Sequence, residues 1–318
     1  MIHNRDSHLA VRMVVAFGLL YVIWGSTYFA IRVALSSIPP ATLAAMRFAL
    51  AGLLMLSVMR LSGQRLVAPR REIASLGVVG CLLLVCGNGL VVWSEQYVAS
   101  GVAALIVATV PLWISILGAI LPRGERLAPT GWTGVALGLI GLGVLFWPKL
   151  VTGSRSDLRG EGALVLAALC WACGSLYSKR VTWTVSPLVA TGWEMLFAGI
   201  ILSLIAAGAG DFSHSAPNGA AWLALAYLVV CGSCLAFSAY IWLLQHVAAA
   251  KVTTYAYVNP VIAVALGWMF LDEPFTLSMA LGTPIIVVAV ALVITAQIHS
   301  TDRAVASEPP VRPARSAA

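Results

Sequence analysis

Two oppositely charged residues, Arg47 and Glu194, lie inside long apolar stretches of the sequence. A charge at the centre of a bilayer costs about 2.5–3.5 kcal/mol, so it is expected to face a cavity or a partner of opposite charge. In one interpretation, Arg47 attracts an anionic group such as a carboxylate, and Glu194 binds a cationic group or a proton. In the other, the two residues form a structural pair, or their side chains reach the membrane interface. The sequence leaves both interpretations open.

Aromatic and hydroxyl side chains recur at helical spacing in two other apolar stretches. The first stretch carries Trp24, Thr27 and Tyr28, and the second carries Trp171, Ser175 and Tyr177. The first set shares one helix face, whereas Tyr177 falls on a different face from its two neighbours. Such a surface suits a small substrate with an apolar or cationic part. The alternative is helix packing through small residues, with the aromatic rings at the membrane interfaces.

Two prolines interrupt further apolar stretches. Each proline removes a backbone donor, and such breaks within a membrane are tolerated where they line a cavity. The two prolines are Pro111 and Pro260. Polar residues in the same or neighbouring apolar stretches are Asn88, Tyr255, Tyr257 and Asn259. These residues are predicted to form a gate or a binding segment, with simple helix kinking as the alternative. Glu95, at the end of its stretch, is interpreted as a solvated loop carboxylate, with a group that binds a cation or a proton at the outer mouth as the alternative.

The elements that must position these residues are predicted to be membrane-spanning helices. The chain has 318 residues, of which 60% are hydrophobic and 10% charged, against about 25% charged in a soluble domain. The apolar blocks have the length of roughly 20 residues that a helix needs to cross a bilayer core. The predicted spans are 13–33, 40–59, 73–93, 100–121, 129–147, 161–179, 187–208, 220–244, 251–271 and 277–297. The sequence therefore indicates an all-α membrane protein with ten transmembrane helices.

An internal repeat relates the two halves of the chain, at a nearly constant spacing of about 149 residues. The matched residues include Trp93 with Trp242, Gln96 with Gln245, Pro111 with Pro260, and Tyr28 with Tyr177. Residues 13–147 and 161–297 are predicted to be two five-helix repeats, with a loop near 148–160 and a disordered cytoplasmic tail over 299–318. An odd number of spans per repeat makes the second repeat enter from the opposite side. The prediction is therefore an inverted repeat, an architecture common in secondary transporters.

The net charge of +7 is explained by its distribution along the chain. With the N-terminus inside, far more Lys and Arg fall in inner segments than in outer ones, as the positive-inside rule requires. Both termini are thus predicted to be cytoplasmic, and a nucleic-acid partner is not expected. No phosphate-binding P-loop and no zinc-protease motif occurs. The six cysteines lie in apolar spans and are interpreted as small packing residues, so we expect neither a metal nor a cofactor, and no catalytic residues.

The chain resembles the EamA-like branch of the drug/metabolite transporter superfamily, which comprises bacterial inner-membrane proteins. The stretches that carry the resemblance are WGSTYFAIRVAL at 24–35, WSEQYVASGVAALIVATVP at 93–111, GERL at 124–127, WACGSLYSKR at 171–180, QHVAAAKVTTYAYVNPV at 245–261 and DEPFT at 272–276. The resemblance implies ten spans, cytoplasmic termini, and export of amino acids, other metabolites or drugs.

The leading hypothesis is a secondary transporter that moves a small metabolite across the inner membrane by alternating access, in the direction of export. The alternatives are a membrane-embedded enzyme, which would need clustered catalytic groups in the spans, and a non-transporting membrane sensor, which would need a signalling module. The expected partners are a small-molecule substrate and the lipid bilayer. A proton or another coupling ion, and a homodimer, are left open.

Overall fold

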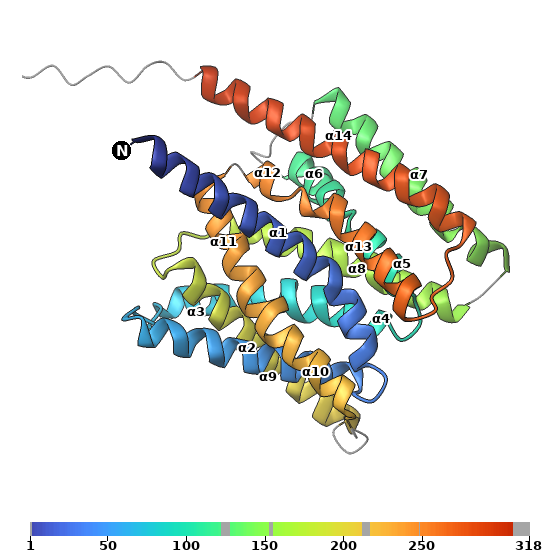
Figure 1. Cartoon of the computed structure of the whole chain (residues 1–318), viewed down its shortest axis with the longest axis horizontal. Helices are drawn as coiled ribbons and strands as arrows, with labels where there is room; N and C mark the ends of the chain where they lie inside the picture. The colour runs from blue at the N-terminus through green and yellow to red at the C-terminus, as the bar shows by residue number, and fades with distance from the viewer. Residues whose placement is uncertain (1, 122–127, 153–154, 212–216, 248, 308–318) are drawn as a thin grey trace, which may run out of the picture.

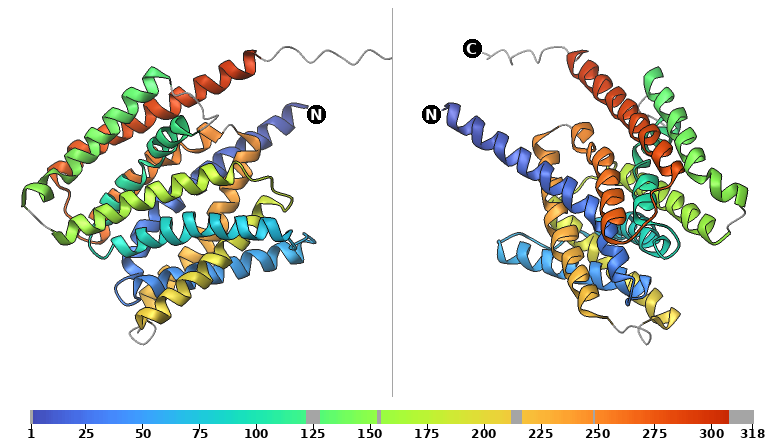
Figure 2. Two further views of the ribbon diagram at one scale, coloured as in Figure 1. Left: turned by 180° about the vertical axis from the view of Figure 1, so that it is seen from behind. Right: turned by 45° about the vertical axis from the view of Figure 1, so that its right-hand side comes forward.

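The computed structural model describes residues 2–121, 128–152, 155–211, 217–247 and 249–307. Within these ranges the regular structure is helical, and no strand occurs. The helices run back and forth along one common direction, and α1 begins at the same end of the bundle at which α14 finishes (Figures 1 and 2). This arrangement confirms the prediction of an all-α fold.

The helices of each half follow the same order. The first half contains α1 (Ile2–Ala34), α2 (Pro40–Leu61), α3 (Arg70–Gly80), the π-helix η1 (Cys81–Gly89), α4 (Leu90–Ser94), α5 (Ser100–Val107), α6 (Val110–Ile120) and α7 (Pro129–Thr152). The second half contains α8 (Arg155–Ser178), α9 (Pro187–Ala209), α10 (Gly219–Tyr227), the π-helix η3 (Leu228–Leu235), α11 (Ala236–His246), α12 (Ala249–Val252), α13 (Tyr255–Phe270) and α14 (Leu277–Ser307).

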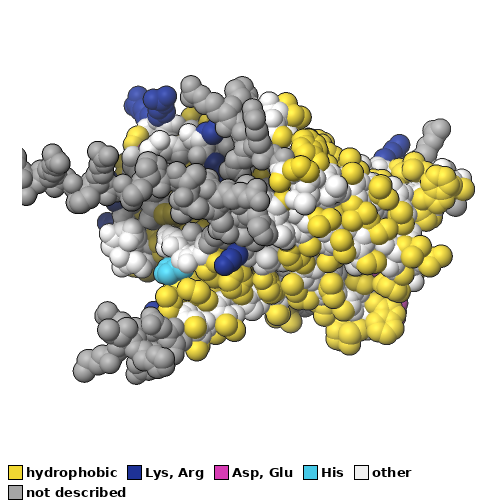
Figure 3. Space-filling model, turned by 90° about the horizontal axis from the view of Figure 1, so that it is seen from above, with side chains coloured by type: hydrophobic (Ala, Val, Ile, Leu, Met, Phe, Trp, Pro, Cys, Tyr) yellow, Lys and Arg dark blue, Asp and Glu magenta, His cyan; other side chains and the backbone are white. Residues whose placement is uncertain are grey.

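Most of these helices are long enough to cross a bilayer. In the described part of the chain, nine helical segments have the length and apolar composition of membrane spans, and Tyr255–Phe270 is a shorter apolar helix. Figure 3 shows hydrophobic side chains over much of one face, with Lys and Arg mostly near one end. A soluble protein does not expose such a large apolar surface, so these faces contact lipid.

The two halves interlock through their first helices. The first helix of the chain, α1, packs against α13 and α11 of the second half, and α8 packs against η1, α6 and α4 of the first half. The outermost pair, α7 and α14, also joins the two halves. Any space at the centre of the bundle is therefore walled by both halves.

Two glycines allow α2 and α9 to touch along their length. A Cβ atom added at Gly52 would lie 2.6 Å from the backbone nitrogen of Leu196, and one added at Gly199 would lie 2.4 Å from the backbone nitrogen of Ala49. In a membrane, small residues bring helix backbones into close van der Waals contact. This contact fixes α2, and with it Arg47, against the second half.

Several predicted spans are not single regular helices. The span at 73–93 contains η1, the span at 220–244 contains η3, and the span at 100–121 is divided between α5 and α6 just before Pro111. The span at 251–271 is likewise divided between α12 and α13. π-Helical segments are frequent at functional sites. Pro111 predicted the division between α5 and α6, but uniformly apolar stretches carry no periodicity that would have revealed the π-helices or the division between α12 and α13.

The structure also extends helices beyond the predicted ends. The loop expected at 148–160 is largely helical, because α7 continues to Thr152 and α8 begins at Arg155. The tail expected to be disordered over 299–318 begins as a continuation of α14, which ends at Ser307. Residues 308–318 lie outside the described part. Hydropathy marks where a helix enters lipid, but it does not mark where the helix ends in water.

Candidate functional site

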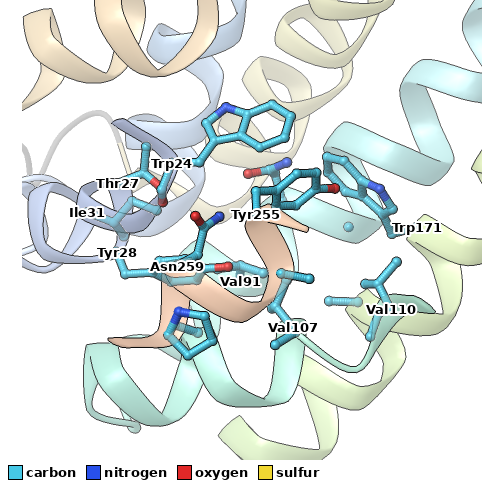
Figure 4. A pocket seen from close by; sticks show the side chains of 18 of the residues that line it. Trp24, Thr27, Tyr28, Ile31, Val91, Val107, Val110, Trp171, Tyr255 and Asn259 are labelled. Carbon is cyan, nitrogen blue, oxygen red and sulfur yellow. The ribbon is translucent and has the colours of Figure 1, made fainter. Parts of the chain in front are cut away.

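A cavity lies where the two halves meet at the centre of the bundle (Figure 4). Its lining comes from α1, α2, η1, α4, α5, α6, α8, α11 and α13 and from the α5–α6 junction. The volume is about 90 Å³, less than that of an engineered protein cavity of about 150 Å³ that binds benzene. Side chains in the lining must therefore move apart before a solute of metabolite size can bind.

Three aromatic rings, Trp24, Phe237 and Tyr255, form one wall of the cavity, and Tyr240, outside the lining, also packs against Trp24. The Trp24 ring lies 5.1 Å from Phe237, 5.4 Å from Tyr240 and 4.9 Å from Tyr255, measured between ring centroids. The Trp24 indole nitrogen donates to the Gly232 carbonyl at 3.2 Å, within the π-helix η3. Edge-to-face and tilted pairs at these distances stabilise one another. The wall is therefore an ordered apolar surface built from both halves.

Arg47 is the charged residue in the cavity lining, and its side chain is only 3% exposed. Its Nε donates to the Ser233 hydroxyl at 3.0 Å, so one edge of the guanidinium is held by η3. Its Nη1 is buried and has no hydrogen-bond partner among the described residues. An unpaired buried donor on a charged group is costly, and an anionic ligand in the cavity would remove that cost.

Further polar groups complete the lining. The hydroxyls of Tyr28 and Tyr255, the Asn88 amide and the Trp171 indole line the cavity and make no side-chain hydrogen bond to another described residue. Asn259 differs, because its amide nitrogen can donate to the carbonyls of Tyr21 at 3.2 Å and Tyr255 at 3.1 Å. The free groups can serve a bound solute.

The structure brings most of the sequence-predicted site residues together in this cavity. Those in the lining are Trp24, Thr27, Tyr28, Arg47, Asn88, Trp171, Tyr255 and Asn259. Pro111 and Pro260 also line it. The break between α5 and α6 comes just before Pro111, as expected for a helix break that borders a cavity, whereas α13 continues through Pro260. Figure 4 shows Trp24, Trp171 and Tyr255 arranged around this space.

Four predicted residues lie outside the lining: Ser175, Tyr177, Tyr257 and Glu194. Ser175 follows Trp171 by one helical turn and so lies beyond the cavity. Tyr177 is 38% exposed, with its hydroxyl 3.2 Å from that of Ser75. Tyr257 is two positions after Tyr255, which turns it to the other side of the helix.

Glu194 lies on the face of α9 that packs against α3. A Cβ atom added at Gly80 would lie 2.6 Å from the Glu194 carbonyl oxygen. Among the described residues, Glu194 forms no ion pair with Arg47. The two charges therefore occupy equivalent places in the repeat without meeting, and the structural pair proposed from the sequence does not form.

Sequence reasoning missed Phe237 and Ser233. Phe237 stands in the repeat where Asn88 stands in the first half, and both line the cavity. The repeat could therefore have identified it. Ser233 holds Arg47, and no sequence signal distinguishes it from the other small residues of its helix.

The comparisons with known proteins agree with this architecture. Residues 12–147 and again 158–295 match the EamA-like transporter family. The chain is 39% identical to the uncharacterized inner membrane transporter YedA of Escherichia coli K12 over 86% of this chain and 88% of that protein. It is 23% identical to the uncharacterized transporter YoaV of Bacillus subtilis over 86% of this chain and 94% of that protein.

A solved crystal structure shares the fold, with a TM-score of 0.62 at 21% identity, over 88% of this chain and 96% of that chain. The family matches and the membrane-length helices together identify a multi-pass inner-membrane transporter and not an enzyme. Its partners are accordingly a small-molecule substrate and the lipid bilayer. With both halves matched, the chain belongs to the EamA-like transporter family.

Proposed function

We propose that this transporter exports a small amphipathic solute bearing a carboxylate, such as an amino acid or a related metabolite, by alternating access. The observation that carries the proposal is the buried Nη1 of Arg47, which lacks an acceptor at the edge of the cavity. A carboxylate is a strong acceptor for a guanidinium. The aromatic wall around Trp24 would hold the apolar part of the same solute.

The arrangement of the helices supports alternating access by inverted repeats. The connection between α2 and α3 lies at one end of the bundle, and α9 ends and α10 begins at the other end (Figures 1 and 2). These are equivalent points of the two halves. Two halves that enter from opposite sides can exchange conformations, which opens the central site first to one side and then to the other.

The charged residues at the ends of the bundle support cytoplasmic termini. The end at which α1 begins also holds the end of α2, the start of α3, the end of α8 and α12 (Figure 1). In or beside these segments lie the exposed residues Arg60, Arg65, Arg70, Arg71, Lys179, Arg180 and Lys251. The segments at the opposite end carry Arg32, Lys149, Arg155 and Arg159. The positive-inside rule assigns the basic end to the cytoplasm.

The inversion is tested by labelling Gln64→Cys and Ala220→Cys, one at a time, with a membrane-impermeant maleimide in intact cells. Both positions are exposed; Gln64 lies in the connection between α2 and α3, and Ala220 lies in the first turn of α10, directly after the equivalent connection. We expect labelling at 220 from outside, and labelling at 64 only after the membrane is permeabilised. The unsubstituted protein controls for its six native cysteines. Labelling of both positions from the same side would overturn the inverted architecture.

The solute class is tested by thermal stabilisation of the purified protein, because a ligand that binds the folded state raises its apparent stability. The panel contains the amino acids and their keto-acid analogues, each beside its carboxamide, together with tetraphenylphosphonium as a drug-like cation. We expect carboxylates to stabilise the protein and the matched amides to have little effect. Stabilisation by the cation alone would contradict the proposal. Efflux from right-side-out and inverted vesicles then gives the direction.

A further inference from the structure

Ser233, in the π-helix η3, directs its hydroxyl differently from other serines within the helices. The hydroxyls of Ser94, Ser203 and Ser238 each donate to the carbonyl four residues earlier, a common arrangement for a serine inside a helix. Ser233 is 0% exposed, and among the described residues its hydroxyl makes one hydrogen bond, which it accepts from Nε of Arg47 at 3.0 Å. The hydroxyl therefore serves Arg47 and not its own helix.

The repeat has no second pair of this kind. Ser233 corresponds to Leu84 in the first half, and Arg47 corresponds to Glu194 in the second. Leu84 is buried in η1 and offers no polar group. A π-helix forms in both halves, so the fold itself does not require a serine at this position. The buried hydroxyl occurs in the half where it meets a charged side chain of the cavity.

The guanidinium of Arg47 is held on two of its sides. Its Cζ atom lies 5.0 Å from the centroid of the Phe48 ring, an arrangement that stabilises a cation over an aromatic face. Its Nε edge meets Ser233, and a Cβ atom added at Gly232 would lie 3.6 Å from Nη2. Neither Nη1 nor Nη2 has a hydrogen-bond partner among the described residues. The edge formed by these two nitrogens is the one left for a solute.

The same turn of η3 also holds the aromatic wall of the cavity. The carbonyl of Gly232 accepts the hydrogen bond from the Trp24 indole at 3.2 Å, and the next residue, Ser233, accepts the one from Arg47. Trp24 and Arg47 come from the first half, and η3 belongs to the second. Ser233 itself does not line the cavity, so a solute does not replace it at Nε.

We propose that Ser233 is a positioning residue that selects the edge of Arg47 presented to the solute, an inference that rests on the proposed function. With Nε held, a solute carboxylate meets Nη1 and Nη2, which can donate two parallel hydrogen bonds to its two oxygens. The matched amide has one oxygen and accepts only one. A donor that is already oriented loses less freedom on binding. Ser233 therefore raises the preference of the site for a carboxylate over its amide, whereas the wall around Trp24 binds the apolar part of both.

The positioning role is tested by competition binding of L-phenylalanine and L-phenylalanine amide to the purified protein. Ser233→Ala removes the acceptor, and the preference for the acid should fall roughly two- to tenfold, the range of one net hydrogen bond, with the affinity for the amide unchanged. Ser233→Thr keeps the hydroxyl and should restore the preference. The matched control, Ser238→Ala, removes a hydroxyl that donates to the Cys234 carbonyl and should behave as the wild type. An unchanged preference in Ser233→Ala, or equal weakening of acid and amide, overturns the inference.

A double-mutant cycle on thermal unfolding tests the contact without any solute. Ser233→Ala should lower the unfolding midpoint where Arg47 is present, because a buried donor loses its acceptor, and should have a smaller effect in an Arg47→Met background. Equal losses in the two backgrounds would mean that Ser233 acts through packing, and they overturn the inference. A wild type that binds acid and amide equally counts instead against the proposed solute class, and the cycle then decides whether Ser233 positions Arg47.

Discussion

Tyr28 and Tyr177 occupy equivalent places in the two halves of the chain, yet Tyr28 lines the central cavity and Tyr177 faces the surroundings. The same contrast holds for Arg47, in the cavity, and Glu194, outside it. The helices that carry these residues correspond in order and in packing partners, since α1 and α8 each pack into the opposite half. The two halves therefore share the same arrangement of helices, but equivalent positions in the two halves carry side chains of different chemistry.

This separation places the charge of the site on one side. The first half supplies the Arg47 guanidinium, whereas the second half supplies the uncharged polar groups of Trp171, Tyr255 and Asn259, and Phe237 where the first half has Asn88. A nearly symmetric scaffold can change conformation in two equivalent ways. A one-sided lining lets the same scaffold hold an amphipathic solute in one orientation, with its charged end towards Arg47.

The largest effect is expected where the halves are most alike, at the glycine contact between α2 and α9. Gly199→Leu places a side chain against the backbone of Ala49, where a Cβ atom alone would come within 2.4 Å of the nitrogen. A backbone neighbour cannot rotate away, so we expect loss of most of the folded protein in detergent. Size-exclusion chromatography and thermal unfolding measure this loss.

Gly208→Leu is the matched control for Gly199→Leu. Gly208 lies on the same helix, and a Cβ atom added there meets nothing within 4 Å. This variant should keep the stability of the wild type. Equal tolerance of both substitutions would mean that the close contact between the halves does not hold the fold together.

The next effect tests the contrast between Arg47 and Glu194. Arg47→Gln removes the cation from the cavity, and a hydrogen bond to a charged group contributes about 1.5–3 kcal/mol, so we expect roughly ten- to hundredfold weaker binding of a carboxylate solute. Arg47→Lys keeps the charge and should recover part of the affinity, although it cannot reproduce the fork of donors. Isothermal titration with L-phenylalanine and its amide measures both variants.

Glu194→Gln should leave the affinity within about twofold, the usual scatter for a position that does not touch the ligand. From the sequence, Glu194 and Arg47 are equally strong candidates for the site, and Glu194 is expected to bind a cationic group or a proton. If Glu194→Gln abolished pH-dependent flux, the structural contrast would be wrong and the sequence interpretation right.

Spacing and composition predicted the fold well because both report on the environment of the backbone. Apolar length identifies a membrane span, and the recurrence of Gly52 as Gly199 and of Pro111 as Pro260 identifies equivalent helices. The π-helices η1 and η3 were not predicted. A π-helix contains an additional residue per turn, which changes the directions of the side chains without changing the hydropathy of the segment.

The site was predictable where helical spacing fixes a face, as for Trp24, Thr27 and Tyr28. The site was not predictable where the burial of a side chain depends on which neighbouring helix packs against that face. Glu95 shows this most clearly, since its place at the end of a span suggested water, yet the structure buries its side chain completely. Burial is a property of the assembled helices, and a single sequence does not carry it.

The smallest expected effect separates the two equivalent tyrosines. Tyr28→Phe removes a hydroxyl that lines the cavity and has no hydrogen-bond partner among the described residues. A net hydrogen bond contributes about 0.5–1.5 kcal/mol, so solute binding should weaken roughly two- to tenfold. Tyr177→Phe removes only an exposed contact with Ser75 and should change binding by less than that. Competition binding with labelled L-phenylalanine resolves the difference, and equal losses in the two variants would mean that Tyr28 acts through packing and not through its hydroxyl.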